Sequence, residues 1–155
     1  MKRALALLTV LTLVVPVTRL EAASTPVINV NTAGIELCPQ SICGAAIFTG
    51  FLFGQVGGNP AALGTFAVAV THDDLPPPLQ PARINGGVFE FRVGLRRIRG
   101  VVLPGGTLFN NGDNTFDVDA VLAITSGGSG TLVYHGLLDH NVFPPTVVGP
   151  VSSTP

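Results

Sequence analysis

Two stretches of the chain place a histidine beside aspartates. His72 is followed by Asp73 and Asp74, and His140 is preceded by Asp139. Imidazole and carboxylate groups can bind a hard or borderline cation, or they can act as a general acid and base. These five residues are therefore candidate ligand or metal residues, provided that the fold brings the two stretches together. The alternative is that they are ordinary polar residues of surface loops.

A second candidate is a group of arginines, Arg96, Arg97 and Arg99, which lie within four residues. Guanidinium groups can hold a carboxylate or phosphate through bidentate contacts, so this group is a candidate anion-binding site. The alternative is salt bridging to acids such as Glu90, or simple solubility. Nucleic-acid binding is not expected, because interleaved aromatic residues and a positive net charge are both missing.

The only two cysteines, Cys38 and Cys43, enclose four residues. Outside the cytosol such a pair indicates a disulfide that closes a short loop and stabilises the fold modestly. A redox pair or half of a metal site is the alternative. A redox motif usually has two intervening residues, and a structural zinc site needs four ligands.

The first residues are typical of a secretory signal peptide. Lys2 and Arg3 precede an uncharged, apolar run over 4–17, and small residues follow at 22–24. A membrane-spanning helix needs about 20 apolar residues, so we expect no stable membrane anchor. We assign 1–24 to the signal peptide and expect the protein to be secreted or periplasmic.

The composition of the 155-residue chain fits one domain with unusually little charge. Charged residues are 11%, against roughly a quarter in an ordinary globular protein, and apolar residues are 46%. Beyond residue 24 there are five arginines, all within 83–99, and eight acidic residues, a net charge of −3. This balance excludes an ordinary disordered chain and gives no field that would attract nucleic acid.

Apolar and polar residues alternate with a period of two in several stretches, as in antiparallel sheets with one solvated face. Missing crossover helices exclude a parallel α/β fold. We predict an all-β antiparallel meander of six or seven strands after the cleaved signal peptide, with a barrel preferred over a sandwich. Strands are expected near 44–56, 63–72, 84–93, 97–109, 115–125 and 131–142, with a short one at 27–32.

The predicted organisation has three parts after the signal peptide. Residues 25–43 form an N-terminal segment with the disulfide loop, 44–142 form the barrel, and 143–155 form a Pro-rich, disordered tail. Strand 44–56 is apolar on both faces. Either a terminal segment or loop covers it outside, or it forms an oligomer interface or lines a ligand cavity.

In a meander, the strands ending at His72, near Asn110 and at His140 end on one rim. His72 and His140 continue inward-facing apolar rows, so both could face the mouth of the barrel. The arginines then lie at the opposite rim, beside the turn at 126–130.

The hairpin from Phe116 to Gly136 resembles the allene oxide cyclase and dirigent barrel family. The resemblance is carried by Leu122-Ala123-Ile124-Thr125-Ser126-Gly127-Gly128-Ser129-Gly130, with Gly136 following in the next strand. It implies an eight-stranded, often trimeric barrel with an apolar cavity. No catalytic residue of that family carries over to this chain.

Three functions stay open. The first is a non-catalytic binding or structural module with an apolar cavity for a small hydrophobic ligand, and with a homo-oligomer as one possible assembly. The second is a small cyclase- or isomerase-like enzyme acting on a hydrophobic substrate. The third is a metal-dependent site at the His/Asp rim, and no other cofactor is implied. The sequence does not decide whether the protein is an enzyme.

Overall fold

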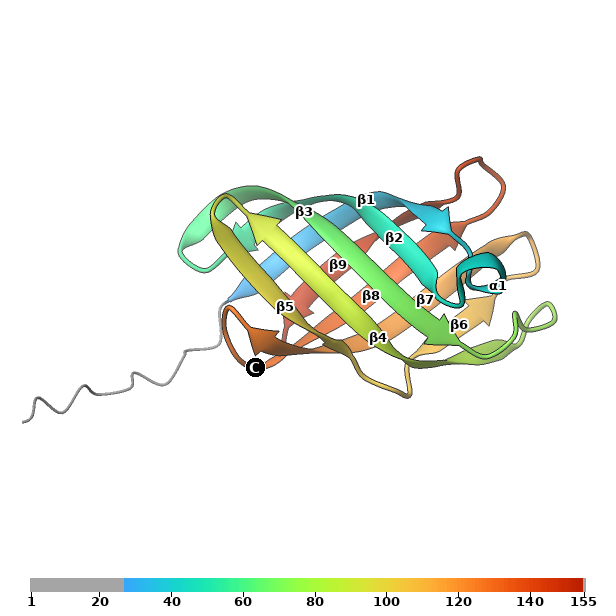
Figure 1. The fold of residues 1–155 in the computed structure, drawn as a ribbon. Coiled ribbons are helices and arrows are strands. Elements are labelled where there is room, and N and C mark those ends of the chain that lie inside the picture. Colours follow the sequence, from blue (N-terminus) through green and yellow to red (C-terminus); the bar gives the residue numbers. More distant parts are fainter. Residues whose placement is uncertain (1–26, 155) are drawn as a thin grey trace, which may run out of the picture.

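The structure, a computed structural model, describes residues 27–154, so the predicted signal peptide lies outside the described residues. Within this range, no helix has the length and apolar character needed to cross a membrane. The elements, drawn in Figure 1, are β1 (Ile28–Cys38), α1 (Gln40–Cys43), β2 (Ala46–Val56), β3 (Asn59–His72), β4 (Pro81–Val93), β5 (Arg96–Val102), β6 (Thr107–Asn110), β7 (Thr115–Ser126), β8 (Thr131–Asp139) and β9 (Thr146–Ser153).

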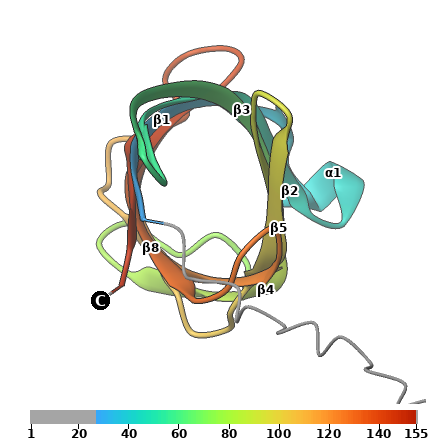
Figure 2. The same cartoon turned by 90° about the vertical axis from the view of Figure 1, so that its left-hand side faces the viewer.

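The strands form a closed, antiparallel barrel, seen along its axis in Figure 2. β9 pairs with both β8 and β1, which joins the two ends of the sheet. β5 and β6 share one position between β4 and β7, because β5 pairs with the second half of β4 and β6 with its beginning. The barrel therefore has eight strand positions. The predicted all-β antiparallel barrel is confirmed.

The break between β5 and β6 divides the strand predicted over 97–109. A turn at Pro104–Gly105 separates them, and Gly105 has φ +103°. Proline has no N–H to donate to the ladder, and the positive φ suits glycine. The strand is therefore interrupted at this turn, while the pairing with β4 and β7 resumes beyond it.

The predicted disordered tail over 143–155 is wrong, because most of it is β9. Val147 and Val151 are buried in the barrel, with 6% and 2% of their surface exposed. Their burial and the pairing on two sides outweigh the high proline content. Pro150, which lacks an N–H, lies where the paired residues of β8 and β9 are interrupted. The barrel therefore runs to residue 153, beyond its predicted limit of 142.

The predicted N-terminal segment over 25–43 is also part of the barrel from Ile28 to Cys38. β1 has eleven residues and pairs with β2 and β9, whereas the prediction ended at residue 32. One short helical turn, α1, follows β1. The disulfide between Cys38 and Cys43 is confirmed and encloses this turn.

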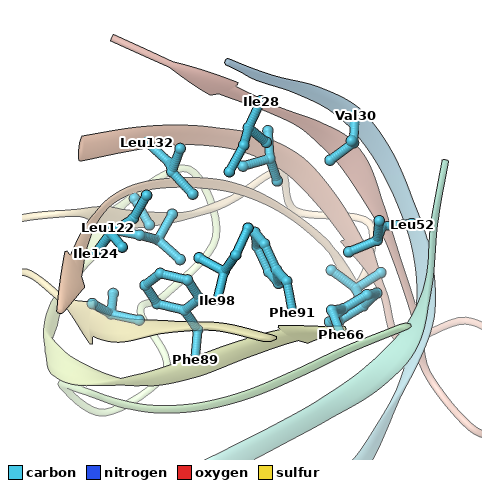
Figure 3. Packing of buried hydrophobic residues seen from close by; sticks show 14 of the residues in the cluster. Ile28, Val30, Leu52, Phe66, Phe89, Phe91, Ile98, Leu122, Ile124 and Leu132 are labelled. Carbon is cyan, nitrogen blue, oxygen red and sulfur yellow. The ribbon is translucent and has the colours of Figure 1, made fainter. Parts of the chain in front are cut away.

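The two ends of the barrel differ. We call the end formed by the loops at 39–45, 73–80, 111–114 and 140–145 the mouth, and the end formed by the turns at 57–58, 94–95 and 127–130 the closed end. The largest fully buried side chains gather toward the closed end, where β1, β5 and β8 begin. Figure 3 shows them packed with Phe89 and Phe91. They are Ile28, Val30, Leu52, Ile98 and Leu132.

Phe66 lies over two glycines of neighbouring strands. Gly34 pairs with Gly50, and Gly50 pairs with Phe66. A Cβ atom on Gly34 would lie 2.6 Å from Cζ of the Phe66 ring and 2.3 Å from the carbonyl oxygen of Thr49. A side chain at position 34 would therefore clash with the Phe66 ring and with the backbone of the neighbouring strand.

Candidate functional site

The mouth brings together the five predicted ligand residues. β3 ends at His72 and β8 ends at Asp139, so Asp73, Asp74 and His140 follow at the same end. A cavity of about 140 Å³ opens there, and His72, Asp74 and His140 line it. The remaining two, Asp73 and Asp139, do not line this cavity.

Asp73 accepts a hydrogen bond from a residue of β4, and Asp139 accepts one from a residue of the loop after β8. The Asp73 carboxylate accepts a hydrogen bond of 2.9 Å from the Asn85 side chain, and the Asp139 carboxylate accepts one of 2.8 Å from the Asn141 backbone. Across residues 27–154, no three histidine, cysteine or acidic side chains are grouped in a way that could hold a metal ion. The five predicted residues therefore share one end of the barrel without forming a set of convergent ligands.

Glu36 is the residue that sequence reasoning missed. It lies near the end of β1, lines the mouth cavity, and has a side chain that is 5% exposed. Its Oε2 atom is 3.2 Å from Nε2 of His140, which makes an ion pair when the imidazole is protonated. The geometry is not that of a hydrogen bond, and the buried Nε2 has no hydrogen-bond partner among the described residues. A carboxylate and an incompletely satisfied imidazole therefore meet at the mouth.

The backbone and a neighbouring ring hold this pair in place. The Glu36 N–H donates to the Pro145 carbonyl at 2.8 Å, and the His140 N–H donates to the Asn114 carbonyl at 3.0 Å. The Phe116 ring packs 5.2 Å from the imidazole, measured between ring centroids. The pair thus depends on contacts among β1, the loop before β7 and the loop after β8.

Helix α1 is attached to the end of β3 at the mouth. The Gln40 side chain donates to the His72 carbonyl at 2.7 Å and accepts from the His72 N–H at 2.6 Å. The His72 ring donates through Nδ1 to the Asp73 carbonyl at 2.5 Å. Since Gln40 also lines the mouth cavity, the disulfide-bonded turn forms one wall of it.

A second cavity, of about 80 Å³, lies inside the barrel. Phe48, Val70, Ile84 and Val118 line both cavities, so this interior cavity adjoins the mouth cavity. Its wall is almost entirely apolar. Among the described residues, the polar groups of its wall come from β1 and β8.

Thr32 and Tyr134 supply the polar groups in the wall of the interior cavity. The Thr32 hydroxyl donates to the Gly149 carbonyl at 2.8 Å. Burial raises the pKa of Tyr134 to about 12, and a hydrogen bond with Thr32 partly opposes that rise. The phenol is therefore a neutral group within an otherwise apolar cavity.

The three predicted arginines lie away from the mouth and have different partners. Arg97 and Arg99 of β5 pair with Glu90 of β4. Arg92, which lies in β4 itself, pairs with the same carboxylate. Hydrogen bonds from Arg92 and Arg99 hold the pKa of the Glu90 carboxyl below its ordinary value. Arg96 instead donates to the Gly127 carbonyl at 3.3 Å. The geometry favours the salt-bridge alternative that the sequence left open.

The outer face of β2 and β3 is apolar and open. Phe51, Phe53 and Leu63 are 64%, 49% and 69% exposed, so no described segment covers them. The expected cover by a terminal segment or loop is therefore absent from residues 27–154. An assembly of several copies stays a prediction.

Comparisons with protein-family models, with curated proteins and with solved structures give no match. The resemblance to the allene oxide cyclase and dirigent family accordingly stays a prediction. A barrel fold by itself does not specify a function, so the residues of the site must indicate it.

Proposed function

We propose that this protein is a binding module that holds a small apolar molecule inside the barrel and admits it through the mouth. The observation that carries the proposal is the apolar interior cavity next to the mouth cavity, beside a closed end filled with large side chains. Transfer of an apolar molecule from water into such a cavity is favourable in proportion to the area buried.

The size of the cavities limits the ligand. Volumes of about 80 Å³ and 140 Å³ are below the roughly 300 Å³ at which pockets begin to hold drug-sized molecules. We therefore expect a slender molecule, such as a short alkyl chain. The disulfide supports an oxidising compartment, so we keep secretion or the periplasm as part of the proposal.

A second candidate is catalysis on a small hydrophobic substrate, of the isomerase or cyclase type. The Glu36–His140 pair favours it, because a carboxylate and an imidazole beside a cavity can transfer protons. Chromatography of a molecule recovered from the protein after incubation separates the two candidates. Binding returns the molecule unchanged, whereas catalysis returns an isomer.

Tyr134 allows a direct test of binding. It is the only tyrosine, the chain has no tryptophan, and the residue lines the interior cavity. We expect n-hexanol to change the tyrosine fluorescence in a saturable way, and native mass spectrometry to detect any ligand retained during purification. An unsaturable response together with a ligand-free protein would contradict the proposal.

A pair of matched variants locates the binding. Ala120 lines the interior cavity, whereas Ala67 is exposed on the outer face. Ala120→Leu should fill the cavity and abolish the hexanol response, while Ala67→Leu adds the same volume outside and should preserve it. Equal responses in the two variants would place the alcohol elsewhere on the molecule.

A further inference from the structure

We infer that the bound molecule carries a protonated primary amine, which binds to both Glu36 and His140 while its alkyl chain lies in the apolar cavity. The inference rests on the proposed function, because it assigns a head group to the same ligand. It follows from the buried Glu36 carboxylate, from the unsatisfied Nε2 atom of His140, and from the distribution of charge over the barrel.

The Glu36 carboxylate is the first observation. A carboxylate removed from water is costly unless a cation or hydrogen-bond donors replace the water. The side chain of Glu36 is 95% buried. Its one polar side-chain contact among the described residues is the distance of 3.2 Å between its Oε2 atom and Nε2 of His140. Its oxygen atoms therefore retain capacity to accept hydrogen bonds from a molecule in the cavity.

The His140 imidazole is the second observation. Its buried Nε2 atom has no hydrogen bond within residues 27–154, although it lies beside the carboxylate. An ammonium group has three N–H donors. One N–H can bind the Glu36 carboxylate and a second can bind Nε2 of the neutral imidazole, so a single head group satisfies both.

The charge distribution favours the same ligand. Four aspartates surround the mouth: Asp73, Asp74, Asp113 and Asp139. Of the arginines in the described chain, only Arg83 lies at this end. The other arginines lie toward the closed end, mostly paired with Glu90. A mouth with an excess of acidic groups attracts cations and disfavours carboxylates.

A matched series of ligands tests the head group. Hexylamine, n-hexanol and hexanoate share one chain and differ in charge, and each is titrated near neutral pH against the full chain by tyrosine fluorescence and calorimetry. We expect hexylamine to bind about tenfold or more tightly than hexanol, since a buried charge-assisted hydrogen bond has this effect. Hexanoate should bind more weakly than hexanol.

Two variants assign the effect to Glu36. Glu36→Gln keeps the shape and removes the charge, so it should lower the ratio of hexylamine affinity to hexanol affinity about tenfold. Asp117→Asn removes the same charge from an exposed residue near the mouth, and both affinities should stay within about twofold. If Glu36→Gln does not fold, the preference of the wild-type protein for hexylamine over hexanol decides whether the ligand carries an amine.

The possible results separate the two proposals. Equal binding of hexylamine and hexanol, or tighter binding of hexanoate, would overturn the amine assignment and leave the binding module intact. Amine selectivity that is lost equally in Asp117→Asn would overturn the role of Glu36. Failure of all three ligands to bind would overturn both the binding module and the amine assignment.

Discussion

At the scale of single residues, Tyr134 offers the clearest titration. Its phenol is buried in the barrel wall, and burial raises its pKa to about 12 because the ionised form loses solvation. The unfolded chain titrates near the ordinary value of about 10. The folded state therefore holds the phenolic proton more tightly than the unfolded state.

This difference predicts how stability depends on pH. The contribution of Tyr134 to folding is complete below about pH 10 and is lost as the pH rises through about 12. Because Tyr134 is the only tyrosine, the ultraviolet absorbance of tyrosinate reports it alone, and we expect a midpoint near 12 in the folded protein. A midpoint near 10 in a protein that is still folded would show that the phenol is solvated.

Glu36 and Glu90 show how the position of a carboxyl determines its role. Glu90 lies on the outer face among Arg92, Arg97 and Arg99, where solvent screens the charges. Glu36 lines the mouth cavity, where its side chain is 95% buried and its partner is an imidazole. The same side chain is a surface ion-pair partner in one position and a candidate ligand-binding group in the other.

At the scale of elements, the disulfide-bonded turn α1 supports the mouth. The loop closed by Cys38 and Cys43 is short, so its loss should reduce the free energy of unfolding by about 2 kcal/mol. Cys38→Ser combined with Cys43→Ser tests this by denaturant unfolding. Because Gln40 lines the mouth, hexylamine affinity should also fall.

Gln40→Ala is the matched comparison for that double variant. It removes both hydrogen bonds to the His72 backbone and keeps the disulfide. We expect weaker ligand binding with a smaller loss of stability, about 1 to 2 kcal/mol for two hydrogen bonds. If both variants bind hexylamine like the wild-type protein, α1 has no part in the site.

At the scale of the whole molecule, β9 closes the barrel. It is the only described strand that pairs with both β8 and β1, and Val147 and Val151 fill the wall between them. Deletion of residues 146–155 would expose two unpaired strand edges and part of the core. We expect loss of the cooperative thermal transition and aggregation.

The control for this truncation is deletion of 154–155 alone, which keeps all of β9. It should preserve a cooperative transition, with only a modest change because the Thr154 backbone N–H bonds the Thr131 carbonyl. A cooperative transition after deletion of 146–155 would mean that the barrel does not need β9. Circular dichroism during heating measures both variants.

Much of the architecture follows from the sequence because it depends on local patterns. Alternation with a period of two predicts strands, and glycine and asparagine predict the turns between them. The up-and-down order of those strands then places His72 and His140 at one end, which the structure bears out. The spacing of Cys38 and Cys43 likewise sufficed for the disulfide.

Pairing between strands that are distant in the sequence determined the parts of the fold and of the site that local patterns do not predict. The prolines near the C-terminus indicate no strand by themselves, and β9 exists because two distant strands pair with it and bury its valines. The inward row of Ile28, Val30 and Thr32 continues in steps of two to Glu36, a signal present in the sequence. Only the closed barrel makes this row face an interior. It also brings His140, which lies 104 residues further along the chain, next to the Glu36 carboxylate.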